Sequence, residues 1–150
     1  MKDILKVKEI MTTNIGYCTP ETSLEEVARL MVEDDCGAIP VLENKESFKP
    51  VGIITDRDIV VRSVAKGVNP LTLKAKDCMT QEVYTIDMND PVEICYDIMI
   101  EHQVRRMVVV DEDGRCRGML SQADIATKAA DADTASVVER ISQLPEVAKV

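Results

Sequence analysis

The chain has 150 residues, a formal net charge of −9 and a sequence pI near 4.6, and 3% of its residues are aromatic, with no tryptophan. An acidic chain with few stacking rings is not expected to bind DNA or RNA. A hydrophobic fraction of 45% suffices for one core or two half-cores. Five cysteines without a CxxC pair, no secretory signal and no apolar run of membrane-spanning length predict a soluble cytoplasmic protein with reduced thiols and no membrane partner.

In chain order, the first half of the sequence predicts an extended piece, a helix, two strands around a polar turn, and a second helix. Thr22 and Glu25 fit a capping box at the start of the first helix, and Gly67 is placed to end the second. Short apolar runs bounded by turn residues predict the strands. The expected ranges are 15–18, 22–35, 38–42, 51–54 and 56–66.

The second half predicts the same order after a linker at residues 68–74. Asp90 supplies a cap and Pro91 a proline at the first helical position, in the same register as the helix of the first half. A tail at residues 131–150 follows, and its portion 135–144 is expected to be helical before Pro145. The expected ranges are 83–86, a helix from 91, strands at 107–110 and 117–120, and a helix at 122–130.

The two halves are copies of one another. Residues 7–12 reappear as 75–80, an offset of 68, and residues 52–58 reappear as 118–124, an offset of 66. Each copy ends an apolar run in a hydroxyl residue with a carboxylate three positions later: Thr55 and Asp58, then Ser121 and Asp124. Two copies of this length predict a pseudo-symmetric pair and not an open array.

The repeated Lys-Glu-Ile-Met-Thr opening, residues 36–42 and 104–111, and the two Gly-to-Asp strings resemble a tandem cystathionine-β-synthase-type (CBS) domain pair, or Bateman module. The resemblance covers about residues 7–130. It implies an α+β fold of two β-α-β-β-α repeats, 1–67 and 75–130, packed about a pseudo-twofold axis. It also implies a stand-alone regulatory homodimer that binds AMP, ADP, ATP or S-adenosylmethionine in clefts between the repeats, signals occupancy to an unknown partner and catalyses nothing.

The repeated polar residues suit such a ligand. A carboxylate accepts hydrogen bonds from two vicinal hydroxyls, so Asp58 and Asp124 are each expected to hold a ribose. Thr55 and Ser121, at the helix starts, are expected to lie close to phosphate, with Arg57 as an added charged fork.

The resemblance also implies the residues around the base. In the first copy they are Ala38, Ile39 and Pro40, with Ile15 on the other side; in the second copy they are Arg106, Met107 and Val108, with Val83. The second copy departs from the usual pattern at Val108 and at Gln122-Ala123, so one intact and one altered site is an open interpretation. Arg105 and Arg106 are then the candidates for the missing positive charge.

Simpler interpretations stay open. The two aspartates fit ordinary helix-start carboxylates, Thr55 and Ser121 fit plain N-caps, and Arg105-Arg106 fits a surface pair. For the whole protein, the alternatives are a structural dimerisation module without a ligand, an S-adenosylmethionine sensor, and a metal-dependent nucleotide hydrolase. His102 is the only histidine, and the cysteines and eight methionines fit core positions, so no catalytic or metal-binding residue is predicted. No cofactor is expected to be obligatory, although Mg²⁺ could accompany a nucleotide.

Overall fold

The computed structural model describes residues 4–129 and Ile141. The tail predicted at residues 131–150 therefore lies outside the described residues, apart from Ile141. Over the described ranges, no helix is long and apolar enough to cross a membrane. The described residues form two compact units: unit 1 comprises residues 4–13, 84–113, 117–129 and Ile141, and unit 2 comprises residues 14–83 and 114–116.

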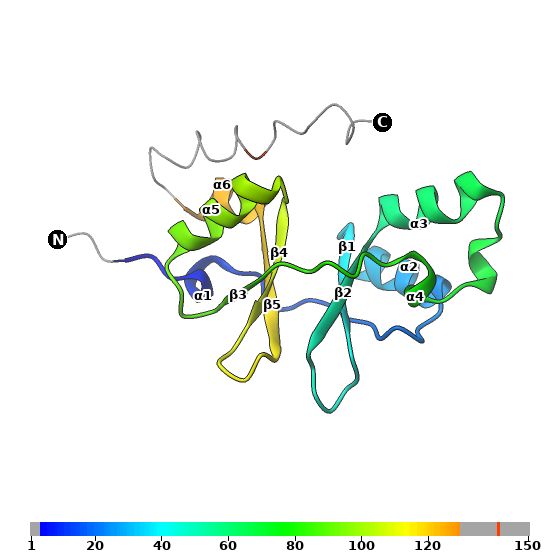
Figure 1. Cartoon of the computed structure of the whole chain (residues 1–150), viewed down its shortest axis with the longest axis horizontal. Helices are drawn as coiled ribbons and strands as arrows, with labels where there is room; N and C mark the ends of the chain where they lie inside the picture. The colour runs from blue at the N-terminus through cyan, green and yellow to red at the C-terminus, as the bar shows by residue number, and fades with distance from the viewer. Residues whose placement is uncertain (1–3, 130–140, 142–150) are drawn as a thin grey trace. The chain divides into compact units, whose positions relative to one another are not determined.

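Unit 2 is built on an antiparallel strand pair with helices beside it (Figure 1). β1 (Ala38–Leu42) pairs with β2 (Pro50–Thr55), and the register shifts between Val41 and Leu42. The extended piece predicted at 15–18 reduces to a single parallel bridge between Cys18 and Val41. The helical segments are α2 (Leu24–Glu33), α3 (Asp56–Arg62), η1 (Val64–Lys66), η2 (Pro70–Thr72) and α4 (Ala75–Cys78).

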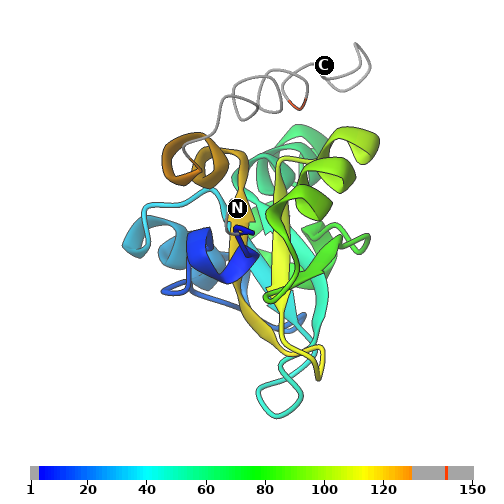
Figure 2. The same cartoon turned by 90° about the vertical axis from the view of Figure 1, so that its left-hand side faces the viewer.

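Unit 1 is built on a three-stranded sheet of β3 (Thr85–Asp87), β4 (Arg106–Val110) and β5 (Cys116–Ser121), in that order. Figure 2 shows β5 in gold and the helix after it in orange. β3 runs parallel to β4 and places Thr85 opposite Val108. The helices of this unit are α1 (Val7–Ile10), α5 (Val92–His102) and α6 (Gln122–Lys128). The predicted α+β class is confirmed by these elements.

In both copies the N-cap of the first long helix, α2 or α5, lies one residue later in the chain than predicted. The Oγ of Ser23, not that of Thr22, accepts the backbone N–H of Glu26 at 3.2 Å. The Thr22 hydroxyl instead accepts the N–H of Thr19 and closes the turn before α2. In the second copy Pro91 occupies the N-cap position and not the first helical position. The buried side chains at the first helical positions, Leu24 and Val92, explain the shared register, because they point into the two cores.

The second helix of the first copy is shorter than predicted. α3 ends at Arg62, where the Ser63 hydroxyl donates to the carbonyl of Ile59, and a short 3₁₀ segment carries the chain to Lys66. Gly67 then ends this segment with a φ of 73°, as the glycine predicted. A left-handed residue is required here, and glycine adopts that conformation without strain.

The compact units do not coincide with the sequence repeats, because the two repeats exchange their opening segments. Residues 7–12 of the first repeat belong to unit 1 with most of the second repeat, and residues 75–80 of the second repeat belong to unit 2 with most of the first. In unit 1, Thr12 forms two backbone hydrogen bonds with Met119, at 2.9 and 3.0 Å. In unit 2, Thr80 forms the equivalent pair with Ile53, at 2.8 and 2.9 Å. Figure 1 shows α1 beside the β3–β4–β5 sheet and α4 beside α2.

The two hydrophobic cores contain these exchanged segments. The unit 2 core consists of Cys18, Leu24, Val27, Met31, Ile39, Val41, Ile54, Ala75 and Cys78. The unit 1 core consists of Val7, Ile10, Ile86, Val92, Cys95, Met99, Met107, Val109, Leu120, Ile125, Ala129 and Ile141. Burying the opening segments in this way removes apolar surface from water in both units. Each Å² of apolar surface buried stabilises the fold by about 25 cal/mol.

Candidate functional site

The register of β1 and β2 assembles the candidate site of the first copy at one end of the strand pair. Ala38 lies opposite Thr55, and the N–H of Asp56 donates to the carbonyl of Gly37 at 3.1 Å. The start of α3 is therefore attached to the start of β1. This attachment brings Ala38 together with the stretch from Thr55 to Asp58 in unit 2.

Thr55 and Asp58 form a reciprocal capping box at the start of α3. The Thr55 Oγ1 accepts the N–H of Asp58 at 3.0 Å, and Oδ2 of Asp58 accepts the N–H of Thr55 at 3.0 Å. The capping interpretation of both residues is thus correct. It uses only one carboxylate oxygen of Asp58, which is half-buried, and over residues 4–129 and 141 no hydrogen bond or ion pair reaches Oδ1.

Ser121 and Asp124 repeat the capping box at the start of α6 in unit 1. The N–H of Ser121 donates to Oδ2 of Asp124 at 3.0 Å, and the Ser121 Oγ accepts the N–H of Asp124 at 3.1 Å. Two further groups reach Oδ1 of Asp124: the Thr12 hydroxyl at 3.1 Å and the Lys128 ammonium at 3.3 Å. Thr12 and Lys128 were not among the predicted site residues, although Thr12 belongs to the repeated opening motif.

The predicted base-contacting residues alternate along β1 and β4, as side chains in strands must. Ile39 and Met107 are 1% exposed and belong to the two cores. Either residue can therefore meet a ligand only through its backbone. Pro40 and Val108 are buried outside those core clusters, on the opposite strand face.

The remaining predicted site residues are exposed or half-buried. Arg57 is exposed, and its N–H donates to Oδ1 of Asp56 at 2.8 Å. Arg105 and Arg106 are exposed, and the Arg105 carbonyl accepts the N–H of Gln122 at 2.8 Å. Ile15 is half-buried and lies in unit 2, as do the other residues predicted for the first site. Val83 also lies in unit 2, whereas the strand residues predicted to share its site, 106–108, lie in unit 1.

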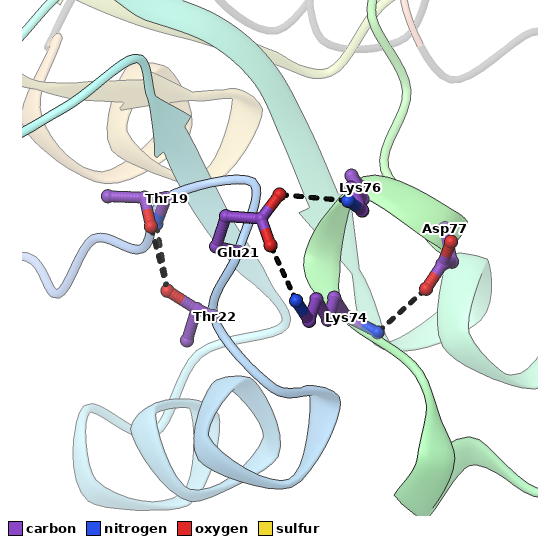
Figure 3. Close-up of polar contacts among 6 residues, drawn as sticks. All are labelled: Thr19, Glu21, Thr22, Lys74, Lys76 and Asp77. Carbon is purple, nitrogen blue, oxygen red and sulfur yellow. Dashed lines mark hydrogen bonds and ion pairs between the residues drawn. The ribbon is translucent and has the colours of Figure 1, made fainter.

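A second polar cluster attaches α4 to the loop before α2 (Figure 3). Glu21 accepts hydrogen bonds from the ammonium groups of Lys74 at 2.6 Å and Lys76 at 2.9 Å. These bonds lower the pKa of the Glu21 carboxyl to about 2, and the bond from Lys74 contributes most. Because both carboxylate oxygens are already paired at the surface, the cluster fixes the exchanged segment and is not a candidate ligand site.

The cysteines behave as core residues with one exception. Burial raises the pKa of the Cys18 and Cys95 thiols to about 12, so both are protonated at neutral pH and poor nucleophiles. Cys78 and Cys116 are also buried, whereas Cys36 is exposed, contrary to its predicted core position. No group of three or more His, Cys, Asp or Glu side chains that could hold a metal ion occurs in the part of the chain that the structure describes.

Comparisons with known proteins identify the repeats. The sequence model of the CBS domain matches residues 7–64 and 75–131. Hypoxic response protein 1 of Mycobacterium tuberculosis is 34% identical over 119 residues, which are 79% of this chain and 81% of the relative. A crystal structure of Hypoxic Response Protein I contains two coordinated zinc ions. It has a TM-score of 0.72 and 32% identity, and the match covers 83% of this chain and 98% of that one.

Two further solved structures have the same fold. A CBS domain pair in complex with 5′-methylthioadenosine and S-adenosyl-L-methionine has a TM-score of 0.71 and 25% identity, covering 83% of this chain and 94% of that one. A hexameric CBS-CP12 protein from bloom-forming cyanobacteria has a TM-score of 0.73 and 25% identity, covering 85% of this chain and 72% of that one.

Proposed function

This chain belongs to the CBS domain family, and from that premise we propose that it binds an adenosine-containing ligand through Asp58 and regulates a partner protein without turnover of its own. The observation that carries the proposal is the half-buried Asp58, whose Oδ1 accepts no hydrogen bond among the described residues. The ligands in one neighbour's structure, 5′-methylthioadenosine and S-adenosylmethionine, share adenine and a ribose diol with AMP, ADP and ATP. The diol is the feature that a carboxylate recognises in all five compounds.

The surroundings of Asp58 suit a nucleoside. Oδ2 is held by the Thr55 N–H, so the carboxylate is already oriented and loses little freedom when Oδ1 accepts a hydroxyl. Arg57, one residue earlier and exposed, is the nearest cation in sequence for a phosphate. Because α3 has only seven residues, its dipole contributes little to phosphate binding. Because the chain carries a net charge of −9, it repels ATP, and Mg²⁺ bound to the phosphates would reduce this repulsion.

Thermal unfolding with each candidate compound tests the proposal. A ligand that binds only the folded chain raises the melting temperature, by an amount that grows with the ratio of its concentration to its Kd. AMP, ADP, ATP with and without Mg²⁺, S-adenosylmethionine and 5′-methylthioadenosine should be compared at millimolar concentration. No rise with any of them would favour the structural dimerisation module, and phosphate release from ATP above a buffer blank would favour a hydrolase.

Asp58→Asn should weaken binding of the compound that raises the melting temperature by about 10–100-fold, since a charge-assisted hydrogen bond contributes about 1.5–3 kcal/mol. The asparagine carbonyl can still accept the Thr55 N–H, so the capping box and the fold are expected to survive. Isothermal titration calorimetry measures the change.

Asp56→Asn is the matched control for this substitution, because Asp56 lies two residues away in the same turn, is exposed and pairs with the Arg57 N–H. It should leave the affinity within about twofold, the effect expected of a surface change. Equal affinities of Asp58→Asn and the wild-type chain would remove Asp58 from the site.

We also propose that the protein is a homodimer that buries the exposed apolar side chains of residues 60–71. Over the described residues α3 has no buried side chain although it carries Ile59, Val60 and Val61, and a helix of a globular protein ordinarily buries its apolar residues. Clustered exposed apolar side chains mark interaction surfaces, and twofold pairing is the commonest arrangement of identical chains. The residues and their exposed fractions are Val60 (55%), Val61 (44%), Val64 (57%), Val68 (41%) and Leu71 (67%).

Val61→Glu should convert the dimer into a monomer, because the new carboxylate would lose its water in the interface. Sedimentation velocity at micromolar concentration should give twice the chain mass of 16.6 kDa for the wild-type chain and one chain mass for the variant. Ile4→Glu, at another exposed apolar position (66%), should leave the dimer intact. A monomeric wild-type chain, or a hexamer like the cyanobacterial neighbour, would contradict the proposal.

A further inference from the structure

The two copies of the carboxylate motif differ in what surrounds them. Asp124 is enclosed: its Oδ2 accepts the Ser121 N–H, while its Oδ1 accepts the Thr12 hydroxyl at 3.1 Å and pairs with the Lys128 ammonium at 3.3 Å. Its side chain is 13% exposed. Groups of the same unit therefore use three of the about four acceptor positions of the Asp124 carboxylate.

In unit 2 the residues equivalent to Thr12 and Lys128 are Thr80 and Arg62, and their side chains form no hydrogen bond with Asp58 among the described residues. Arg62 replaces the lysine, and its guanidinium donates to the carbonyls of Cys78 at 2.9 Å and Met79 at 2.7 Å. Thr80 replaces Thr12 in the backbone bridge to Ile53. Neither side chain bonds to Asp58 in the described part of the chain.

The difference lies in the partners of the two cations. In Arg62 both hydrogen bonds are donated by Nη1, whose two hydrogens are directed at the carbonyls of Cys78 and Met79. The ammonium of Lys128 has three donors, and it divides them between the Ile10 carbonyl at 3.3 Å and Asp124. A single arginine-to-lysine difference between the copies thus adds a counter-charge to one carboxylate and not to the other.

We infer that Asp124 is closed to ligands and fastens the N-terminal segment to unit 1, so that Asp58 alone of the two carboxylates takes a ribose diol. The inference deepens the proposed function and rests on it for the role of Asp58. A diol donates two hydrogen bonds, so at Asp124 it would have to displace the Thr12 hydroxyl or the Lys128 ammonium, which the fold already holds in place. The chain accordingly binds one adenosine ligand and not two.

Equilibrium dialysis with AMP and, separately, S-adenosylmethionine as probes measures the number of sites. The wild-type chain should bind one molecule per chain, Asp124→Asn should still bind one, and Asp58→Asn should bind at least about 10-fold more weakly. Two molecules per chain, falling to one in Asp124→Asn, would overturn the inference while leaving the proposed function intact. A chain that binds neither probe would instead remove the proposed function.

A melting-temperature cycle tests the closed state of Asp124 without any ligand. Thr12→Val should lower the melting temperature by about 2–4 °C through loss of one hydrogen bond, and should cost clearly less in an Asp124→Asn background. Thr80→Val with Asp58→Asn is the matched control and should be additive. Additive effects at Thr12 and Asp124, or coupling at Thr80 and Asp58, would overturn the inference even if no probe binds.

Discussion

Leu120→Ala is expected to lower the free energy of unfolding by about 2–5 kcal/mol, the range for a buried leucine replaced by alanine. Leu120 lies in β5, is 0% exposed and belongs to the unit 1 core with Met107 and Ile125. The loss combines the missing transfer free energy of the side chain with the cavity left among neighbours that relax only in part. Urea denaturation followed by far-ultraviolet circular dichroism measures it.

Two further variants show whether the loss comes from burial. Ile54 is the equivalent residue of the other copy and is also 0% exposed, so Ile54→Ala should cost a similar amount through the unit 2 core. Val32 is 81% exposed, and Val32→Ala should stay within about 0.5 kcal/mol of the wild-type chain. A Leu120→Ala loss as small as that of Val32→Ala would mean that β5 is not packed into the core as described.

The strands and helices were predictable because each is encoded by local residues. The strand pair at 38–42 and 51–54 appears as β1 and β2 with one extra residue at each end of β2. Its signal is a short apolar run bounded by turn residues, which requires no knowledge of distant contacts. The helix starts were missed by one residue, since Thr22 and Ser23 are both good caps and burial of Leu24 decides between them.

The exchange of the opening segments was not predictable from local pattern. Residues 7–12 and 75–80 are copies of one another, but nothing in their spacing indicates which repeat each one packs against. That choice is made by pairings far apart in sequence, such as Thr12 with Met119. The predicted boundaries at 1–67 and 75–130 therefore follow the repeats, whereas the compact units follow the contacts.

The candidate site was predictable up to the point where distant residues enter it. The hydroxyl and carboxylate of each copy were found from their repetition, and both form the same capping box. What separates Asp58 from Asp124 is the Thr12 contact, 112 residues from Asp124 in sequence, together with Lys128. The exchange of arginine for lysine at positions 62 and 128 is visible in the sequence, but its consequence depends on the fold.

Gly118→Ala is expected to destabilise the chain by about 1–3 kcal/mol and to loosen the N-terminal segment from unit 1. A Cβ at residue 118 would lie 2.5 Å from the backbone carbonyl oxygen of Thr12, a distance at which the backbone must shift. Overpacking of this kind costs about 1–3 kcal/mol. The shift should weaken the two hydrogen bonds between Thr12 and Met119, and hydrogen exchange at those two amides, with denaturation in urea, measures the effect.

Gly52→Ala is the matched control for this prediction, because Gly52 faces the equivalent exchanged segment in unit 2. There the added Cβ would lie 3.0 Å from the Thr80 carbonyl oxygen and 3.0 Å from the Met79 sulfur. The contact is less severe, and the flexible end of a methionine can move aside, so Gly52→Ala should cost less than Gly118→Ala. Equal losses, or unchanged exchange at Thr12 in Gly118→Ala, would mean that the close approach of the two backbones does not hold the opening segment of the chain.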